Sequence, residues 1–373
     1  MSKYINGQAV IQHFEMWSPK SYAVEGDKNG LMVGTLNKQV KKIMIALDVL
    51  EDVMDEAIEE QVDLIIAHHP LLFRPLKKID VDTPHGRIVA KAIKHDITIY
   101  AAHTNLDIAN GGVNDMMAEA LNLKNLEVLA PTQTIPLKKI VVFTPKTHEK
   151  ELREALGKIG AGHIGNYSHC TFNTIGTGMF KPEEGSNPFL GQQGDLEEVE
   201  EVKVETIIPS NLQKKVVSTI LKTHPYEEPA FDIYPLDNKG EVLGLGRVGV
   251  LPNEMTLADF AEYVKKAFDV TGARVVGNLQ APIKKVAVLG GDGNKYMKDA
   301  IMKGADVFVT GDVYYHVAHD AMMDGLNIVD PGHNVEKVMK EGVKKKLDHF
   351  LIEKRYETKV IASKLNTDPF QFV

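Results

Sequence analysis

The stretch "DLIIAHHP", residues 63–70, is an apolar run that ends in two adjacent histidines and a proline. The run predicts a buried strand, and Pro70 would stop its hydrogen-bond ladder because proline has no N–H to donate. Adjacent side chains on a strand point to opposite faces, but at its end both imidazoles can turn into the loop above the sheet. Neutral imidazole is the commonest metal-binding side chain. His68 and His69 are therefore candidate metal ligands; the alternative is one histidine in the core and one capping a helix.

Strands and helices alternate on both sides of the molecule's middle third. In the N-terminal third, the predicted strands are 41–49, 63–69 and 97–107, and the predicted helices are 50–61, 85–96 and 111–123. In the C-terminal third, strands are predicted at 284–293, 305–313 and 326–334, with helices beginning near 294, 314 and 335. Such alternation predicts an α/β fold in which two halves of one mostly parallel sheet are covered by helices.

The two thirds also resemble each other segment by segment. "KKIMIALDV" matches "KKVAVLGGD", "VDLIIAHHP" matches "ADVFVTGDV", and "DITIYAAHTNLD" matches "LNIVDPGHNVE". Each strand is followed by a loop that carries Asp, His or Glu. Since open α/β sheets place ligands at the carboxyl ends of their strands, we expect the two halves to face one another across a shared cleft.

The middle of the chain has a different order of elements. Between 137 and 236 the pattern predicts strand, helix, strand, strand, helix and strand, at 137–145, 147–161, 168–182, 200–209, 211–223 and 229–236. This βαββαβ order is the ferredoxin-like arrangement. We therefore predict an inserted domain at 131–240 between two halves of a metal-binding domain, 1–130 and 241–373. The Gly- and Pro-containing segment 181–195 is expected to be an excursion from the insert.

Composition restricts the class of protein. The 373 residues are 43% apolar and 25% charged, as in globular proteins, and the net charge of -8 comes from interspersed acidic and basic residues. A nucleic-acid surface is not expected, because phosphate binding needs clustered Lys and Arg. Cys170 is the one cysteine, which excludes an intrachain disulfide and a cysteine zinc site. With no leader or membrane-spanning run, a cytoplasmic location is expected.

Two further loops carry the side chains of a metal site. The loop after the third N-terminal strand contains His103 and Asp107, and the matching C-terminal loop contains His333 and Glu336, whose spacing of three puts them on one helix face. Each has a structural alternative: His103 as a core residue, and the two carboxylates as groups that favour helix N-termini.

A single metal site explains all these residues together more simply than a separate structural role for each. Three of the four imidazoles together with the two carboxylates are already too many for one tetrahedral zinc that keeps an open position, so we predict two divalent ions. The donor types suit zinc, manganese or iron.

Two glycine motifs are interpreted as structural. "GLGRVG", 244–249, matches the dinucleotide-binding pattern, but "VLPNEM" follows it and no helix begins there to receive a pyrophosphate. "GGDG", 290–293, could bind an anion through its backbone amides, although a plain turn between strand and helix is the simpler interpretation.

The motifs and their order resemble one known family, the GTP cyclohydrolase 1 type 2 homologs, also called Nif-three-like proteins. The segments that carry the resemblance are "GDKNGLMVG" (26–34), "AHHP" (67–70), "HTNLD" (103–107), "GLGRVG" (244–249), "GGDG" (290–293) and "PGHNVE" (331–336). They span nearly the whole chain. The insert, with "GHIGNYSHCTF" and "HPYEEPAFD", is similar to the PII-like or CutA-like domain of the long bacterial members.

The resemblance implies a two-metal centre, a toroidal homohexamer and a metal-dependent hydrolase that opens the imidazole ring of GTP. The ligands that it implies are His68, His69, Asp107, His333 and Glu336. Zinc is the first candidate ion, and a nucleotide is a candidate substrate or effector.

Within that reaction, we expect His103 to shuttle protons, because imidazole titrates near neutral pH. The cations of Arg74, Lys77 and Lys78 are candidates for contacting phosphates, unless they belong to a solvated loop. Two alternatives stay open: a metal-binding or regulatory scaffold that senses a small molecule through its insert, and another two-metal hydrolase acting on phosphoesters or amides.

Overall fold

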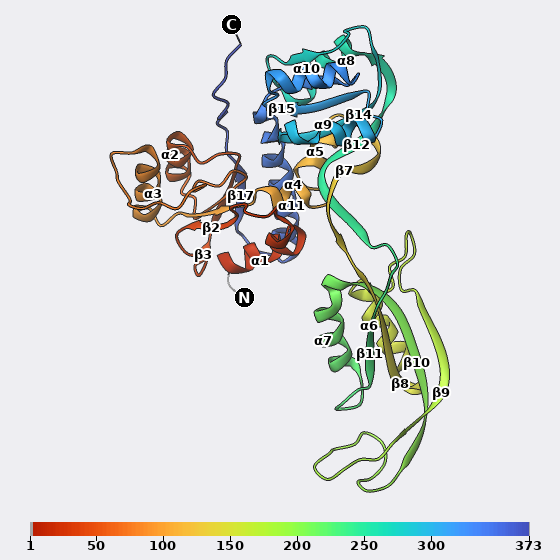
Figure 1. Ribbon diagram of the computed structural model, residues 1–373. Helices are drawn as coiled ribbons and strands as arrows, with labels where there is room; N and C mark the ends of the chain where they lie inside the picture. The colour runs from red at the N-terminus through yellow and green to blue at the C-terminus, as the bar shows by residue number, and fades with distance from the viewer. Residues whose placement is uncertain (1–2, 373) are drawn as a thin grey trace. The chain divides into compact units, whose positions relative to one another are not determined.

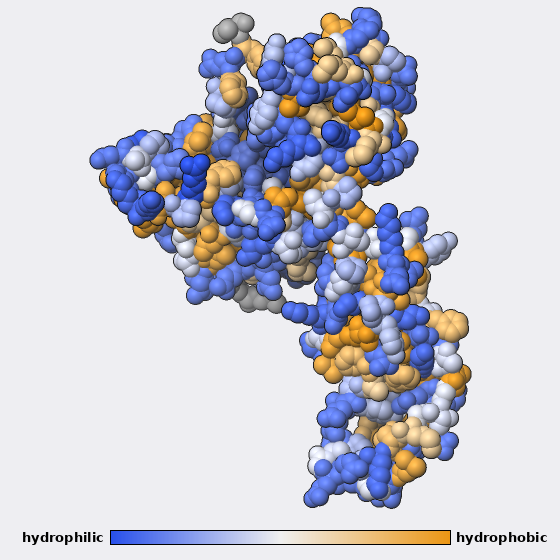
Figure 2. Space-filling model, in the orientation of Figure 1, coloured by the Kyte–Doolittle hydropathy of each residue, from blue (hydrophilic) through white to orange (hydrophobic). Residues whose placement is uncertain are grey.

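The computed structural model describes residues 3–372, which form two compact units. One unit contains the chain up to Gln133 together with the chain from Leu243 onward, and the other is Thr134–Val242. Figure 1 shows each unit with its own sheets and helices. On the face shown in Figure 2, hydrophilic residues predominate and hydrophobic ones are interspersed. No helix among the described residues is long and apolar enough to cross a membrane.

The first unit contains two separate mixed sheets, so the expectation of two halves of a single sheet is wrong. The first sheet has the order β17 (Lys359–Ala362), β4 (Lys42–Ala46), β5 (Leu64–Ala67), β6 (Thr98–Ala101) and β2 (Gly30–Val33). The second has the order β13 (Arg274–Val276), β16 (Asn327–Asp330), β15 (Val307–Gly311), β14 (Pro282–Asp292), β12 (Glu241–Thr256) and β7 (Lys124–Ile135). Two short strands, β1 (Ile5–Asn6) and β3 (Gln39–Val40), pair separately.

Edge strands that the sequence patterns did not reveal explain the difference. In each sheet the βα units supply three parallel strands, β4–β5–β6 and β14–β15–β16. Antiparallel strands then flank them: β2 in the first sheet, and β12 and β13 in the second. The free side of β4 is taken by β17 from the C-terminal end of the chain. The parallel strands of the two halves therefore have no free edges at which to join.

Alternating side chains of the first sheet enter two different cores. Leu64 and Ile66 of β5 point into a core shared with the second sheet, whereas Ile65 and Ala67 point into a core on the opposite face. All four are fully buried, as expected of a central parallel strand covered on both faces. The apolar run in residues 63–70 is therefore a two-sided strand.

Helices close both cores. The core private to the first sheet is covered by α2 (Glu51–Glu59) and α3 (Pro84–Lys94). The shared core contains side chains of α1 (Gly7–Trp17), α5 (Val113–Ala120), α8 (Leu257–Phe268) and α11 (Val338–Glu353) together with β14, β15 and β16. The other helices of this unit are α4 (Thr104–Ile108), α9 (Met297–Met302) and α10 (Tyr315–Met323). A continuous core thus fixes the position of one sheet against the other.

Two predicted elements are corrected at the ends of strands. The strand predicted at 97–107 ends at Ala101, and α4 follows it, so Asp107 lies in a short helix. The helix predicted from 335 begins earlier, in the 3₁₀ turn η5 (His333–Lys337), and continues as α11. Both corrections place candidate ligands in a short helical segment that follows a strand.

The motif "GLGRVG" lies inside β12, in agreement with its interpretation as structural. Its glycines let β12 approach β7 closely: a Cβ at Gly244 would lie 2.1 Å from the carbonyl oxygen of Ala130. Arg247 is buried, and its guanidinium donates to both carboxylate oxygens of Asp115 on α5 at 2.7 Å. The motif thus joins a strand of the second sheet to a helix of the N-terminal half.

The second unit is one antiparallel sheet with two helices. Its elements are, in chain order, β8 (Leu137–Pro145), α6 (Glu149–Lys158), β9 (Thr171–Phe180), β10 (Glu197–Pro209), α7 (Gln213–Thr223) and β11 (Phe231–Pro235). The strand order is β11-β8-β10-β9. Apolar residues of α6 and α7 pack with Ile140, Val142 and Ile208 of the sheet to form a separate core. Residues 181–196 between β9 and β10 form neither helix nor strand.

We predict that Asp115→Ala lowers the free energy of unfolding of the first unit by about 3 kcal/mol, because the Arg247 charge is then left buried without its partner. The double variant Asp115→Leu, Arg247→Met should lose less, since no charge remains buried. Denaturant unfolding of the three proteins measures both effects. A loss below about 1 kcal/mol for Asp115→Ala, as for exposed ion pairs, would contradict the prediction.

Candidate metal centre

All six candidate side chains meet in one cluster at the carboxyl ends of strands from both sheets. They are His68 and His69 beyond β5, His103 and Asp107 beyond β6, and His333 and Glu336 beyond β16. Their potential ligand atoms form three overlapping groups, and within each group all atoms lie within 4.8 Å of one another. Loops far apart in the sequence therefore converge, as the matching of the two thirds predicted.

Glu336 lies between three of the imidazoles. Its Oε2 atom is 3.0 Å from Nε2 of His69, 3.3 Å from Nε2 of His333 and 3.6 Å from Nε2 of His68. The side chain is only 3% exposed. This single carboxylate contacts histidines contributed by both halves of the first unit.

The local backbone conformation sets the direction of these side chains. The amide groups of His68 and His69 donate to the carbonyl oxygens of Ala46 and Leu47, which continues the ladder beyond the last residue of β5. His333 and Glu336 share a 3₁₀ turn, in which residues three apart are eclipsed, and so they point the same way. Expecting both imidazoles at the strand end to face the loop region was therefore correct.

Each of the four imidazoles is oriented by an oxygen acceptor at its Nδ1 atom. The pairs are His68 with Ala102 O at 2.9 Å, His69 with Asp48 Oδ1 at 2.6 Å, His103 with Asp27 Oδ1 at 2.6 Å, and His333 with Asp312 Oδ2 at 2.7 Å. An ionised carboxylate or a carbonyl can only accept, so each Nδ1 carries the donated proton. In the neutral rings the lone pair is then at Nε2, and three of these Nε2 atoms approach Glu336.

Three orienting carboxylates were missed in the sequence. Asp48 and Asp312 follow β4 and β15, in the segments "KKIMIALDV" and "ADVFVTGDV", where an acidic residue after the strand is part of the pattern noted above, so a signal was present. Asp27 belongs to "GDKNGLMVG" and also accepts from the amide and hydroxyl of Thr104. Its distance of 76 residues from His103 left nothing to reveal the pair.

The motif "GGDG" makes room for the cluster. A Cβ at Gly290 would lie 2.8 Å from Oε1 of Glu336, and one at Gly291 would lie 3.2 Å from Nε2 of His333. Gly291 also has a positive φ of 67°, which favours glycine. Larger residues here would push against the side chains of the site.

Two buried atoms of the cluster have no hydrogen-bond partner among residues 3–372. They are Nε2 of His68 and Oδ1 of Asp107, which lie 3.6 Å apart. His68 is fully buried and Asp107 is 7% exposed, so water does not freely reach either residue. Buried polar atoms are rarely left unpaired, and a cation between a ring nitrogen and a carboxylate oxygen would satisfy both. The donor set therefore fits a metal.

Carboxylates raise the pKa of two imidazoles in the cluster, those of His69 and His333. Burial opposes charge on His69, but its bonds with Asp48 and Glu336 raise its pKa to about 10. For His333, burial is likewise outweighed by Glu336 and Asp312, and its pKa rises to about 9. Burial raises the pKa of Asp107 to about 6. Without a metal, protons on the imidazoles compensate the buried carboxylates.

The basic residues beyond the histidine pair lie outside the cluster. Arg74, Lys77 and Lys78 are exposed, and Lys78 pairs with Asp80 at 2.6 Å. Nearby, the exposed ring of Phe73 meets the edge of His103, with centroids 5.9 Å apart. The structure thus shows a solvated loop that borders the site.

Comparison with known proteins finds a family model and curated relatives that match nearly the whole chain. A family model described as Duf34/NIF3 (NGG1p interacting factor 3) matches residues 5–369. Two curated relatives are named GTP cyclohydrolase 1 type 2 homolog: one from Halalkalibacterium halodurans, 67% identical over 371 residues, and one from Bacillus subtilis, 59% identical over 373 residues. Each alignment covers 100% of both chains.

Solved structures agree with the sequence comparisons. A Bacillus cereus protein described as related to NIF3 superposes with a TM-score of 0.95 at 61% identity, and a Staphylococcus aureus protein with a TM-score of 0.76 at 34% identity. Both cover 100% of this chain and of their own.

We predict that the metal-stripped protein loses stability between pH 7 and 9.5. A histidine whose pKa in the folded protein is raised above its ordinary 6.5 stabilises the fold fully below 6.5, and that contribution is lost as the pH rises to about 9 for His333 and about 10 for His69. Urea midpoints of chelator-treated protein measure the loss. His69→Gln should flatten the profile, and an unchanged slope in that variant would contradict this assignment.

Proposed function

The chain belongs to the Duf34/NIF3 family, and we propose that it binds a pair of divalent metal ions through His68, His69, Asp107, His333 and Glu336. The observation that carries the proposal is the orientation of the imidazoles. Every ring of the cluster is held at Nδ1 by an oxygen, which is how metal-binding histidines are fixed in tautomer and direction. Glu336, in contact with three Nε2 atoms, would hold a metal ion together with these imidazoles.

Zinc is the ion that we propose first, with manganese and iron as alternatives. Imidazole nitrogen and carboxylate oxygen suit all three, and no cysteine takes part. The three orienting carboxylates add negative charge around the ligands, which favours a doubly positive ion over the protons that it displaces.

We propose a hydrolytic activity for this centre: one water adds to C8 of the guanine imidazole ring of GTP and opens the ring to a formamide, and a second water hydrolyses that formamide, so that C8 leaves as formate. The curated relatives' name, GTP cyclohydrolase 1 type 2 homolog, points to this substrate. Two divalent ions would supply an acidified water and a polarised target bond. Residues of the chain supply the remaining steps: proton movement and the orientation of the nucleotide.

His103 is the residue proposed to move protons. Asp27 accepts from its Nδ1, so Nε2 can take a proton from water and return it to the leaving ring nitrogen. Its side chain is 21% exposed, whereas that of His68 is 1% exposed, which suits exchange of protons with solvent. The exposed Phe73 ring beside it offers a surface for stacking a base, and Arg74 and Lys77 are proposed contacts for the phosphates.

A scaffold without catalysis is the second candidate. The second unit motivates it, because Thr134–Val242 contributes no residue to the cluster and has its own core. We propose that this unit is a ferredoxin-like domain with a sensing role. Its βαββαβ order and the β11-β8-β10-β9 strand order support that assignment.

We predict that Asp48→Asn weakens zinc binding about 10- to 100-fold without touching a ligand, because the His69 ring loses its orienting carboxylate. Calorimetric titration of chelator-treated protein and elemental analysis measure affinity and stoichiometry. The exposed His349, which lies outside the cluster, provides a matched control in His349→Gln. Binding of one ion or none to the unaltered protein would refute the two-metal proposal.

For catalysis, we expect anaerobic incubation of the zinc-, manganese- or iron-loaded protein with GTP to release formate. His103→Gln should lower kcat about 100-fold or more while the metal content stays constant, because general acid-base catalysis is lost and the ligands remain. His349→Gln again serves as the control. If two ions bind but no formate appears under any of these conditions, the scaffold function replaces the hydrolase.

A further inference from the structure

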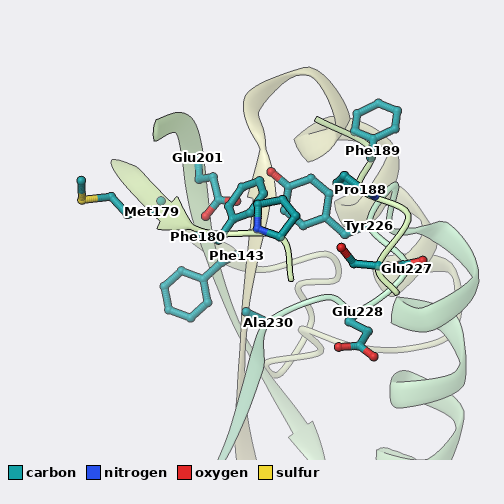
Figure 3. Close-up of a pocket in the computed structure, with 13 residues that line it drawn as sticks. Phe143, Met179, Phe180, Pro188, Phe189, Glu201, Tyr226, Glu227, Glu228 and Ala230 are labelled. Atoms are coloured by element: carbon teal, nitrogen blue, oxygen red, sulfur yellow. The ribbon is translucent and has the colours of Figure 1, made fainter. Parts of the chain in front are cut away.

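The second unit contains a pocket that plays no part in the metal centre. It has a volume of about 270 Å³ and is bounded by the end of β9, by β10, and by the segments 182–189 and 226–230 (Figure 3). Ligand pockets in proteins measure about 300–1,000 Å³, and this one, just below that range, has room for a small ligand only. Aromatic rings and carboxylates dominate its walls.

The aromatic part is a row of three rings. Tyr226 lies between Phe180, at a centroid distance of 5.6 Å, and Phe189, at 6.3 Å. Hydrogen bonds hold the middle of this row in place: the amide of Tyr226 donates to Nδ1 of His224 at 3.1 Å, and Nε2 of the same histidine donates to the carbonyl oxygen of Phe143 at 2.8 Å. Phe143 itself also lines the pocket. The backbone that carries the central ring is therefore positioned before any ligand arrives.

The charged part is entirely negative. Glu201, Glu227 and Glu228 line the pocket, and no lysine or arginine does. Within the described part of the chain, none of the three forms a salt bridge within 4.0 Å. The neighbouring segment 181–200 adds to this potential, because it carries six further carboxylates and one lysine. Both the walls and their surroundings thus favour a cation.

Glu201 is brought to the pocket by a glycine. A Cβ at Gly178 on the neighbouring strand would lie 2.2 Å from Oε2 of Glu201, so a larger residue there would displace the carboxylate from this position. Burial and then the negative charge of Glu201 raise the pKa of Tyr226. On the other side, Oε1 of Glu227 accepts from the amide of Asn187 at 2.8 Å and ties the segment 182–189 to the pocket.

We infer that this pocket binds a small organic cation of the alkylammonium class. Aromatic faces attract an ammonium group through their quadrupoles, and carboxylates that form no salt bridge complete its neutralisation, while the rings cover its alkyl part. An anion such as a nucleotide meets no positive group here. A bare divalent ion would leave four aromatic rings without a role. Such a cation would be the ligand for the sensing role proposed above for the second unit. Its binding does not depend on the chemistry of the metal centre.

Calorimetric or NMR titration of the full chain tests the inference, with choline and n-butylammonium as probes. The matched controls are their uncharged analogues, 3,3-dimethylbutan-1-ol for choline and butan-1-ol for n-butylammonium. We expect at least one cation to bind about 10-fold or more tightly than its neutral analogue. Equal affinity of both pairs, or no saturable binding of either cation, would overturn the inference. Titrations with and without zinc separate this result from the metal proposal.

Variants locate the site. Glu201→Gln should weaken binding of the cation several-fold and leave the weak binding of the neutral analogue unchanged, whereas Tyr226→Leu should weaken both. Glu198→Gln removes the same charge from an exposed position on β10 that does not line the pocket, and it should have no effect. Equal losses in Glu198→Gln and Glu201→Gln would show a general surface attraction and would refute the site. Binding of a lysine-containing peptide in place of both amines would likewise refute a small-molecule ligand.

Discussion

The buried carboxylate of Glu336 is the constraint on which the first unit depends. A charge that is 3% exposed is tolerated only when it is paired, and its partners here are imidazoles from both halves of the unit. Protons on His69 and His333 provide that pairing without a metal, and a bound cation would provide it in their place. The site therefore needs both halves in register, and the core shared between the two sheets supplies that register. Folding and binding are coupled through the same contacts, since neither half can neutralise the cluster alone.

Much of this arrangement was predictable from the sequence because strands and their ends follow local rules. An apolar run that stops at His68 and His69, and loops with His103, Asp107, His333 and Glu336 after comparable strands, were enough to predict one cluster. The separation into two sheets was not predictable, because it depends on edge strands such as β2 and β17 whose short segments carry no strong pattern. The acceptor behind His103 was equally hidden, although Asp48 and Asp312 stand at strand ends where the sequence did give a signal. The contact of His103 is tertiary, and an aspartate such as Asp27 is unremarkable until the fold places it beside a histidine.

Carboxylates serve two different purposes in the two units, and their surroundings decide which. In the first unit Asp107 and Glu336 face ring nitrogens, and further carboxylates hold those rings by Nδ1. Such a cluster offers directed lone pairs, which a metal ion requires. In the second unit, Glu201 and Glu228 lie beside phenyl and phenol rings, which offer faces without lone pairs. The same residue type therefore favours an inorganic cation in one place and an organic cation in the other.

The independence of the two sites follows from how the chain is built. The second unit has its own core, and its pocket is formed within it by β9, β10 and the segments beside them, so ligand binding there needs no residue of the metal centre. Conversely, none of the groups that hold or orient the cluster belongs to Thr134–Val242. An effect of an alkylammonium ligand on the metal centre would therefore have to pass through a change in the second unit as a whole. Coupling of this kind is reciprocal: if the ligand alters metal affinity by some factor, the metal must alter ligand affinity by the same factor. The titrations with and without zinc measure that factor directly.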